Sequence, residues 1–291
     1  MCYNIETLAI IDTQSKIHPP IPQKKTKMKT LFIFNFIIIA FIVLALIGVK
    51  RICKSKRTEK LLLIASSLLT IACHYSSLLY HHLWGESAMW YLTDNPNLIL
   101  PIYPCNVVMW SCLIYAFLKN TDSRFGRFLG DYIFWFGIVS TLVGMFANVD
   151  FIRNPTLSDY DVTKGIVAHA TLLFNVLLLP LFGRTTFRFK RNMSHIVISV
   201  LMMYAIGLYC NLVFKALVSE EMAYHVNSMF IIHSPFEGLG FLTYPTIAAF
   251  AIVIYFILFT VCEIIAFPKG ERYYDMLIAS LKKGRAGTDG E

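Results

Sequence analysis

The sequence predicts an all-α protein, a polytopic bundle of transmembrane helices, from its composition, its apolar stretches and the distribution of its basic residues. Hydrophobic residues make up 56% of the 291 residues and charged residues 15%, whereas about 25% of an average soluble chain is charged. A stretch of roughly 20 apolar residues can cross a bilayer as a helix. We therefore expect seven spans, at 31–49, 61–82, 99–118, 132–149, 164–183, 195–217 and 243–266.

The chain divides into three segments: a polar N-terminal segment (1–30), the seven-span domain (31–266) and a basic C-terminal tail (267–291). The first apolar stretch, 31–49, contains no charged residue. The residues before it lack the order of a signal peptide, so we expect this stretch to remain as a span. A six-span form without it is the alternative, and Met28 is a second possible start. The connection at 218–242 contains apolar residues and is expected to turn back toward the membrane.

Lysine and arginine alternate between the connections and thereby predict the orientation. Six lie in the loop after the first span, three after the third, four after the fifth and five in the tail, whereas 83–98 and 218–242 hold none. Short basic loops remain on the cytoplasmic side, so we expect a cytoplasmic C-terminus. Four lysines before the first span are the exception. The same loops account for the net charge of +8 through contact with anionic lipid, and no nucleic-acid partner is expected.

Cys105 differs from the other cysteines because Pro101 and Pro104 precede it. Proline fits the first position of a helix but not its interior. The spacing therefore predicts a helix that begins at Pro104, with Cys105 in its first turn. The helix dipole and the unpaired N–H groups favour a thiolate there. A packing cysteine beside a proline-capped helix start explains the same pattern.

Many polar residues fall at one depth when each helical residue is counted as about 1.5 Å of rise. The set in the outer third is His81, His82, Cys105, Asn148, His169, Asn211, Asn227 and His233. Ionisable residues within spans usually face the bundle interior or a water-filled cavity. A lone histidine is more often a hydrogen-bonded core residue, but the shared depth favours a site. We expect the opposite half of the molecule to be apolar.

A cysteine nucleophile with a histidine base carries out acyl transfer through a thioester. Cys105 and His169 come from different helices at matching depths, and asparagines can orient the imidazole or bind an oxyanion. A zinc site is the competing chemistry, with His74 and His81 joined by His169, His225 or His233. The sequence holds no HxxxH or HExxH pair, so thiol chemistry is favoured, and no metal or cofactor is expected.

The run from Leu100 to Asn106 (LPxxxCN) at the start of a span resembles the YwaF-type membrane proteins, which are related to the eukaryotic transmembrane protein 164 family. The resemblance continues through 134–137, Ala168-His169 and 227–229 with Pro235, and covers about residues 30–266. It implies an acyltransferase that moves a fatty acyl chain between phospholipids, including ether lipids, with Cys105 as acyl acceptor and His169 as base. The sequence departs from the pattern at Tyr103, where bacterial members often have histidine, and by carrying Pro104.

The predicted function is therefore a lipid acyltransferase whose partners are membrane phospholipids. Its catalytic residues are Cys105 and His169, in an outward-facing chamber that opens laterally to lipid. The candidate substrate-binding residues are Tyr103, Asn106, Asn148, Asn211, Asn227 and His233. The alternative is a non-enzymatic transporter or ligand-binding protein that uses the same chamber.

Overall fold

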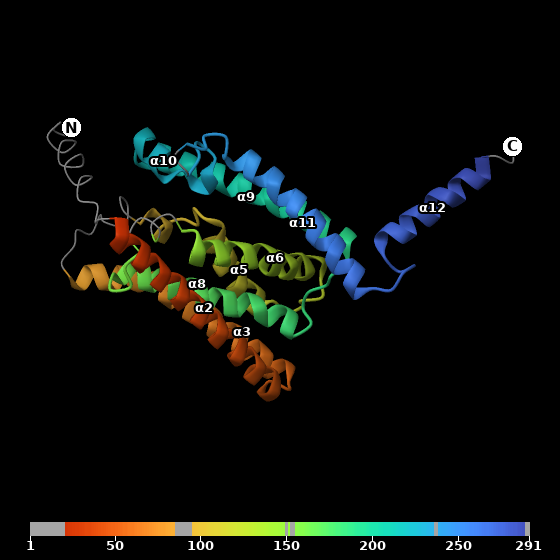
Figure 1. Ribbon diagram of the computed structural model, residues 1–291, viewed down its shortest axis with the longest axis horizontal. Helices are drawn as coiled ribbons and strands as arrows, with labels where there is room; N and C mark the ends of the chain where they lie inside the picture. The colour runs from red at the N-terminus through yellow and green to blue at the C-terminus, as the bar shows by residue number, and fades with distance from the viewer. Residues whose placement is uncertain (1–20, 85–94, 149–150, 152–154, 236–237, 289–291) are drawn as a thin grey trace.

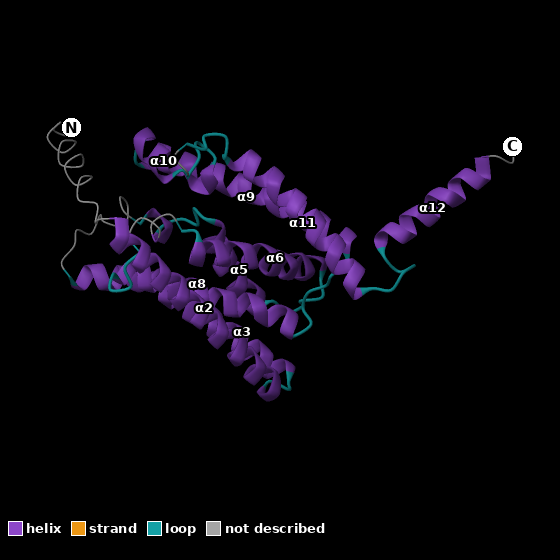
Figure 2. Cartoon of the chain, viewed as in Figure 1, coloured by secondary structure: helices purple, strands orange, loops and turns teal. Residues whose placement is uncertain are grey.

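The computed structural model describes residues 21–84, 95–148, 151, 155–235 and 238–288, which form helices and loops without a strand (Figures 1 and 2). The elements are α2 (Ile21–Ile52), α3 (Lys56–Leu83), η1 (Pro96–Leu98), α5 (Pro104–Phe117), α6 (Arg124–Phe146), α8 (Tyr160–Leu181), α9 (Phe189–Leu217), α10 (Glu220–Val226), η2 (Ser228–Phe230), α11 (Tyr244–Ala266) and α12 (Tyr273–Thr288). Six of these helices are long and apolar enough to cross a membrane, namely α2, α3, α6, α8, α9 and α11. The predicted class, an all-α polytopic bundle, is confirmed.

The third predicted span differs from the others because its helix is short. Helix α5 has 14 residues, which at 1.5 Å per residue is about 21 Å, against a hydrocarbon core of about 30 Å. The helix begins at Pro104, as predicted. The chain nevertheless passes from the end of α3 to the opposite end of the bundle, where Thr121 accepts a hydrogen bond from Arg184 at 2.8 Å.

A non-helical segment at 99–103 and the short helix α5 therefore make this passage together. The six-span alternative omitted the first stretch, which instead forms the apolar part of α2. The shortened crossing is the third one. Helical periodicity does not distinguish a full span from a short helix with a non-helical segment before it, because 99–118 is apolar throughout and only its prolines interrupt the pattern.

Polar side chains cap the helices that surround the site. The Ser55 hydroxyl accepts from Thr58 N–H at the start of α3, and the Ser123 hydroxyl accepts from Gly126 N–H at the start of α6. The Asp159 carboxylate accepts from two N–H groups at the start of α8. These caps satisfy backbone donors that a helix end leaves unpaired, so they fix where each span begins.

Helices α5 and α6 lie between α3 and α8 on one side and α9 and α11 on the other (Figure 1). Helix α2 packs mainly on α8, and α12 extends away from the bundle. Gly137 of α6 contacts both Val108 of α5 and Val176 of α8, because a glycine lets the helices approach closely. The buried core also includes Tyr132 and Met203. Large apolar side chains remain exposed on α2, α9 and α11, as expected of surfaces that face lipid.

The expectation of an apolar inner half is wrong at the helix ends. Asp131 of α6 is fully buried and accepts hydrogen bonds from Arg191 at 2.7 Å and His195 at 2.8 Å, both on α9. Glu263 of α11 is also buried and accepts from the backbone N–H of Phe189 at 3.2 Å. These carboxylates are tolerated because each has partners that compensate its lost hydration. The sequence showed the charges but not their pairing.

Candidate functional site

Cys105 lies half-buried in the first turn of α5. Its Sγ lies against the backbone N–H groups of Cys105 and Asn106. The Asn106 side chain accepts from the backbone N–H of Tyr103 at 3.3 Å, so it caps the helix that carries the cysteine. Asn106 was predicted to bind substrate, and the contact it makes is structural.

The segment before α5 is non-helical, and the connection between α9 and α11 covers it. The carbonyl of Ile102, which is 1% exposed, accepts from Met229 N–H at 2.9 Å and from the Ser228 hydroxyl at 3.0 Å. The side-chain oxygen of Asn211 in turn accepts from Ser228 N–H at 2.8 Å. Irregular backbone at membrane depth must be satisfied by protein rather than lipid, and these bonds satisfy it.

Three residues of this connection adopt left-handed backbone conformations: Asn227 (φ 43°), Met229 (φ 55°) and Phe230 (φ 58°). Asn227 holds the turn with its side chain, whose oxygen accepts from Ile232 N–H at 3.0 Å and from His233 N–H at 3.3 Å. Met229 is buried, which confirms that the connection at 218–242 turns back into the bundle.

Glycine at position 207 makes the room that Met229 needs. A methyl group at Gly207 of α9 would lie 2.8 Å from Met229 side-chain atoms and 2.6 Å from Ile231. Such distances are too short for carbon atoms. The close approach of 227–231 to α9 therefore depends on this glycine.

His169 projects from α8 toward α6. Its Nδ1 lies 2.7 Å from the carbonyl oxygen of Gly165. A neutral imidazole with Nδ1–H donating to a carbonyl has its lone pair on Nε2. Nε2 faces Gly144 of α6, where a methyl group would collide with the ring, and makes no hydrogen bond within the described residues. Phe151 lies edge-on to the ring, at 6.5 Å between centroids.

The packing at Gly137 gives a common level from which both residues can be measured. Cys105 precedes Val108 by three residues, and His169 precedes Val176 by seven. At 1.5 Å per residue, Cys105 lies about 4.5 Å and His169 about 10.5 Å from the level of Gly137, toward the N-terminal ends of α5 and α8. The two side chains are therefore on neighbouring helices and about 6 Å apart in depth. No hydrogen bond joins them in the described structure.

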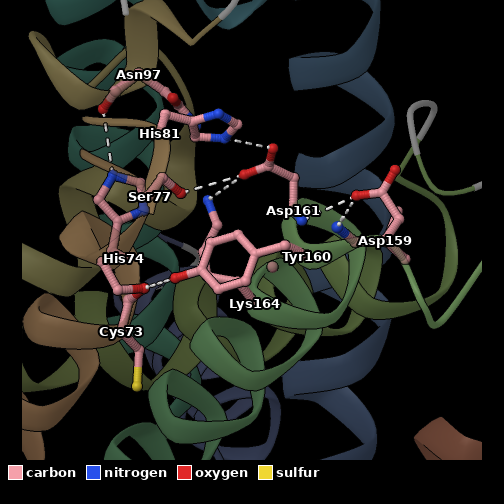
Figure 3. A network of polar contacts seen from close by, with 12 residues as sticks. Cys73, His74, Ser77, His81, Asn97, Asp159, Tyr160, Asp161 and Lys164 are labelled. Atoms are coloured by element: carbon pink, nitrogen blue, oxygen red, sulfur yellow. Dashed lines mark hydrogen bonds and ion pairs between the residues drawn. The ribbon is translucent and has the colours of Figure 1, made fainter. Parts of the chain in front are cut away.

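A polar network connects the C-terminal end of α3 to the N-terminal end of α8 (Figure 3). The Asp161 carboxylate accepts from His81 Nε2 at 2.9 Å and from the Ser77 hydroxyl at 3.2 Å, and it lies 3.7 Å from Lys164 Nζ. Only 10% of the Lys164 side chain is exposed. The sequence reasoning placed His81 here but missed Asp161. The sequence did indicate this contact, because Asp161 lies at the start of one span at the same depth as His81 of another.

Aromatic and backbone contacts extend this network. Tyr80 stacks on Tyr160, with centroids 3.8 Å apart and planes 6° apart, and the Tyr160 hydroxyl donates to Ser76 at 2.7 Å. His74 Nε2 lies 3.3 Å from the carbonyl oxygen of Asn97, the middle residue of η1. The pair predicted to share a helix face, His74 and His81, is thus used in two separate contacts.

The remaining predicted site residues lie at the edge of the bundle. His233 Nε2 is 3.0 Å from the carbonyl oxygen of Tyr224. Asn148 follows the C-cap of α6 and is half-buried, whereas His82 and His225 are exposed. Within the described residues, no group of three or more His, Cys, Asp and Glu side chains could hold a metal ion.

The fold and the polar residues gathered toward one end of the bundle define a polytopic membrane protein with a candidate site near that end. Residues 24–265 match the TMEM164 family, and the chain belongs to this family. The relationship inferred from the LPxxxCN run is therefore confirmed. No curated protein and no solved structure matches the chain.

Proposed function

We propose that this protein transfers fatty acyl chains between membrane phospholipids, with Cys105 as nucleophile and His169 as proton carrier. The observation that supports this proposal most is the placement of Cys105. It lies in the first turn of a helix, with its Sγ against backbone N–H groups of that turn. On the neighbouring helix α8, the Nε2 of His169 makes no hydrogen bond within the part of the chain that the structure describes. The resemblance to acyltransferases of the family is consistent with it.

In the first half-reaction the Cys105 sulfur attacks the ester carbonyl carbon of a donor phospholipid. A C–S bond forms, the ester C–O bond breaks, and the thiol proton passes through His169 to the departing oxygen, which leaves as the hydroxyl of a lysophospholipid. Burial disfavours a charged thiolate, so the thiol needs a base during attack. The backbone N–H groups of the first turn of α5 can stabilise the carbonyl oxygen as it gains charge.

In the second half-reaction the hydroxyl of an acceptor lysophospholipid attacks the thioester. The C–O bond forms, the C–S bond breaks, and the hydroxyl proton passes through His169 back to the sulfur. Because the reacting oxygen must lie within hydrogen-bond reach of Nε2, the difference of about 6 Å in depth between Cys105 and His169 suits a hydroxyl held between them.

Most of the predicted substrate-binding asparagines would act through the backbone. Asn106 caps α5, while Asn211 and Asn227 hold the connection that covers Ile102. We propose that they position Cys105. Asn148, Tyr103 and His233 stay candidates for contact with the phospholipid headgroup, because they lie at the outer rim of the same region.

The first experiment is labelling of the purified protein in lipid with an activity-based thiol probe, read by mass spectrometry. Cys105 is half-buried, whereas Cys112 and Cys210 are 4% and 0% exposed. We expect labelling of Cys105 to exceed that of the two buried cysteines at least tenfold, and to fall in His169→Ala and in the presence of donor lipid.

The second readout is the lipid product, with Cys112→Ala as the matched control on the same helix. Acyl transfer should disappear in Cys105→Ala and survive in Cys112→Ala. Equal labelling of Cys105 and Cys112 would make Cys105 a packing residue. Undiminished transfer in Cys105→Ala would exclude the thioester route, and ligand binding or uptake that is independent of Cys105 would favour the non-enzymatic alternative.

A further inference from the structure

A second lipid site follows from a groove on the opposite side of α3 and α8 from Cys105. We propose that this groove holds one acyl chain of an anionic phospholipid, whose headgroup meets the basic turn between α2 and α3. The ligand is a membrane lipid of the leaflet on the side of that turn. Neither Cys105 nor His169 lines the groove, so the site is separate from the proposed reaction centre.

The groove is an elongated cavity of about 510 Å³ between α2, α3 and α8. Its walls include Ile42 and Ala45 of α2, Leu62 and Ala65 of α3, and Phe174 of α8. Ligand pockets typically enclose about 300–1,000 Å³. The space exists because α2 packs mainly on α8 and leaves the face of α3 beside it uncovered.

The side chains that line the groove offer no free hydrogen-bond donor to a polar ligand. Its two hydroxyls belong to Ser66 and Thr171. Ser66 donates to the side-chain oxygen of Asn175 at 2.5 Å, and Thr171 donates to the carbonyl of Ala168 at 3.0 Å. Both hydroxyl protons are used within the protein, so the groove suits a hydrocarbon chain.

The length of the groove matches the part of an acyl chain within one leaflet. The first and last lining residues on each helix are seven residues apart: Ile38 and Ala45, Leu62 and Leu69, and Val167 and Phe174. Seven steps correspond to about 10.5 Å of rise. Half of the hydrocarbon core is about 15 Å. One chain that starts at the nearer membrane face would fill the groove.

Charge identifies the headgroup. Ala45 and Leu62 end the groove on the side where α2 finishes and α3 begins, each five residues from a basic side chain, Lys50 and Arg57. Five residues are about 7.5 Å of rise, the region in which a lipid's ester groups lie beneath its phosphate. The turn carries six exposed basic residues: Lys50, Arg51, Lys54, Lys56, Arg57 and Lys60.

These bases are not neutralised within the described structure. None of the six forms an ion pair there, and Glu59, the acid of the same turn, is bound by Arg184 at 2.9 Å. Clusters of four to eight basic residues beside a membrane helix recruit anionic lipid by charge. An anionic phospholipid complements both the charge of the turn and the apolar groove above it.

The experiment compares photoreactive phosphatidylserine and phosphatidylcholine that carry the same diazirine-labelled chain, in vesicles with the full-length protein. We expect phosphatidylserine to label peptides of α2, α3 and α8 at the groove at least fivefold more, with competition by unlabelled phosphatidylserine. Ala65→Trp, which fills the groove at an exposed lining position, should abolish the difference. The control Ala249→Trp, at an exposed position of α11, should leave it unchanged.

Charge is tested separately with Lys50→Gln, Arg51→Gln and Lys54→Gln combined. This variant should remove the preference for phosphatidylserine, whereas Lys119→Gln, Arg124→Gln and Arg127→Gln combined should retain it. Equal labelling by the two lipids would overturn the proposal, as would competition by soluble glycerophosphoserine as strong as that of the lipid. Labelling must persist in Cys105→Ala, since the groove is independent of the reaction.

Discussion

At the scale of single residues, the sequence predicts the height of a residue along its helix better than the direction in which its side chain points. Asn106, Asn211 and Asn227 were predicted to bind substrate together, and in the structure their side chains bond to backbone groups. Counting along a helix gives the height of a residue, and an apolar span carries little periodicity from which to infer its facing side. Most of these partners are backbone atoms, which no residue type reveals, although Asn227 Nδ2 also lies 3.2 Å from Nδ1 of His233.

Gly144 provides a residue-scale test of His169. Gly144→Ala would place a methyl group against the imidazole and push Nε2 away from its position. We expect acyl transfer to fall at least tenfold. Gly48→Ala in α2, where nothing lies within 4 Å of the new methyl, should leave transfer unchanged, and alanine should make the helix up to about 1 kcal/mol more stable.

The measurement is a double-mutant cycle with His169→Ala, read by the rate of lipid product formation. If Gly144→Ala acts through His169, it should have no further effect once the imidazole is absent. Full additivity of the two losses would show that Gly144→Ala disturbs the bundle elsewhere, and that the ring position does not matter.

Asp131 gives a test of stability at the opposite end. Asp131→Asn leaves Arg191 and His195 without their buried carboxylate. Breaking a buried pair costs roughly 3–5 kcal/mol, and the partial exposure of Arg191 reduces this to about 2–3 kcal/mol. Thermal unfolding in detergent should show a lower midpoint. Asp122→Asn, in an exposed turn, is the control, and an equal shift in both variants would contradict the role of the buried pair.

At the scale of elements, the start of α5 was predictable and its cover was not. Two prolines within four residues dictate where the helix can begin. The cover comes from a connection more than 120 positions further along the chain, as the Ser228–Ile102 bond shows. Three non-glycine residues of that connection adopt left-handed conformations, which asparagine tolerates but methionine and phenylalanine rarely adopt. Tertiary contacts decided this element.

Asn227 tests the connection between α9 and α11. Asn227→Ala removes the side-chain bonds to Ile232 and His233 and places a methyl-bearing residue at φ 43°. We expect a loss of about 2–4 kcal/mol in the local opening free energy. Asn227→Gly loses the same bonds but tolerates the backbone conformation, so it should cost about 1 kcal/mol less.

Hydrogen exchange of segments 100–103 and 227–233 measures the effect, because the backbone N–H of Met229 donates to the Ile102 carbonyl and the N–H of Ile102 donates to Leu100. Asn120→Ala is the control, since Asn120 accepts from Asp122 N–H in an exposed turn. Faster exchange at 227–233 alone would mean that the connection does not hold the segment before α5.

At the scale of the whole molecule, the prediction of a helical membrane bundle needed only composition and the length of the apolar stretches. The number of long spans was harder to predict. A full span and a short helix preceded by a non-helical segment have similar amino-acid compositions. The groove was not predictable, since it depends on how far α2 stands from α3. Long-range packing, not local pattern, separates these outcomes.

Orientation is the remaining whole-molecule prediction. Six long helices and the shorter α5 predict seven passages, with His82 and His225 at one end and Lys119 and Lys269 at the other; all four are exposed. Each is replaced by cysteine in a variant lacking the native cysteines and is treated with an impermeant maleimide in sealed right-side-out vesicles. Since basic loops stay cytoplasmic, we expect 82 and 225 to react in sealed vesicles, and 119 and 269 only after permeabilisation. Reaction of the reverse pair would refute the orientation and leave the fold intact. Disagreement between 82 and 225 would refute the seven passages themselves, because it would place α5 wholly on one side of the membrane.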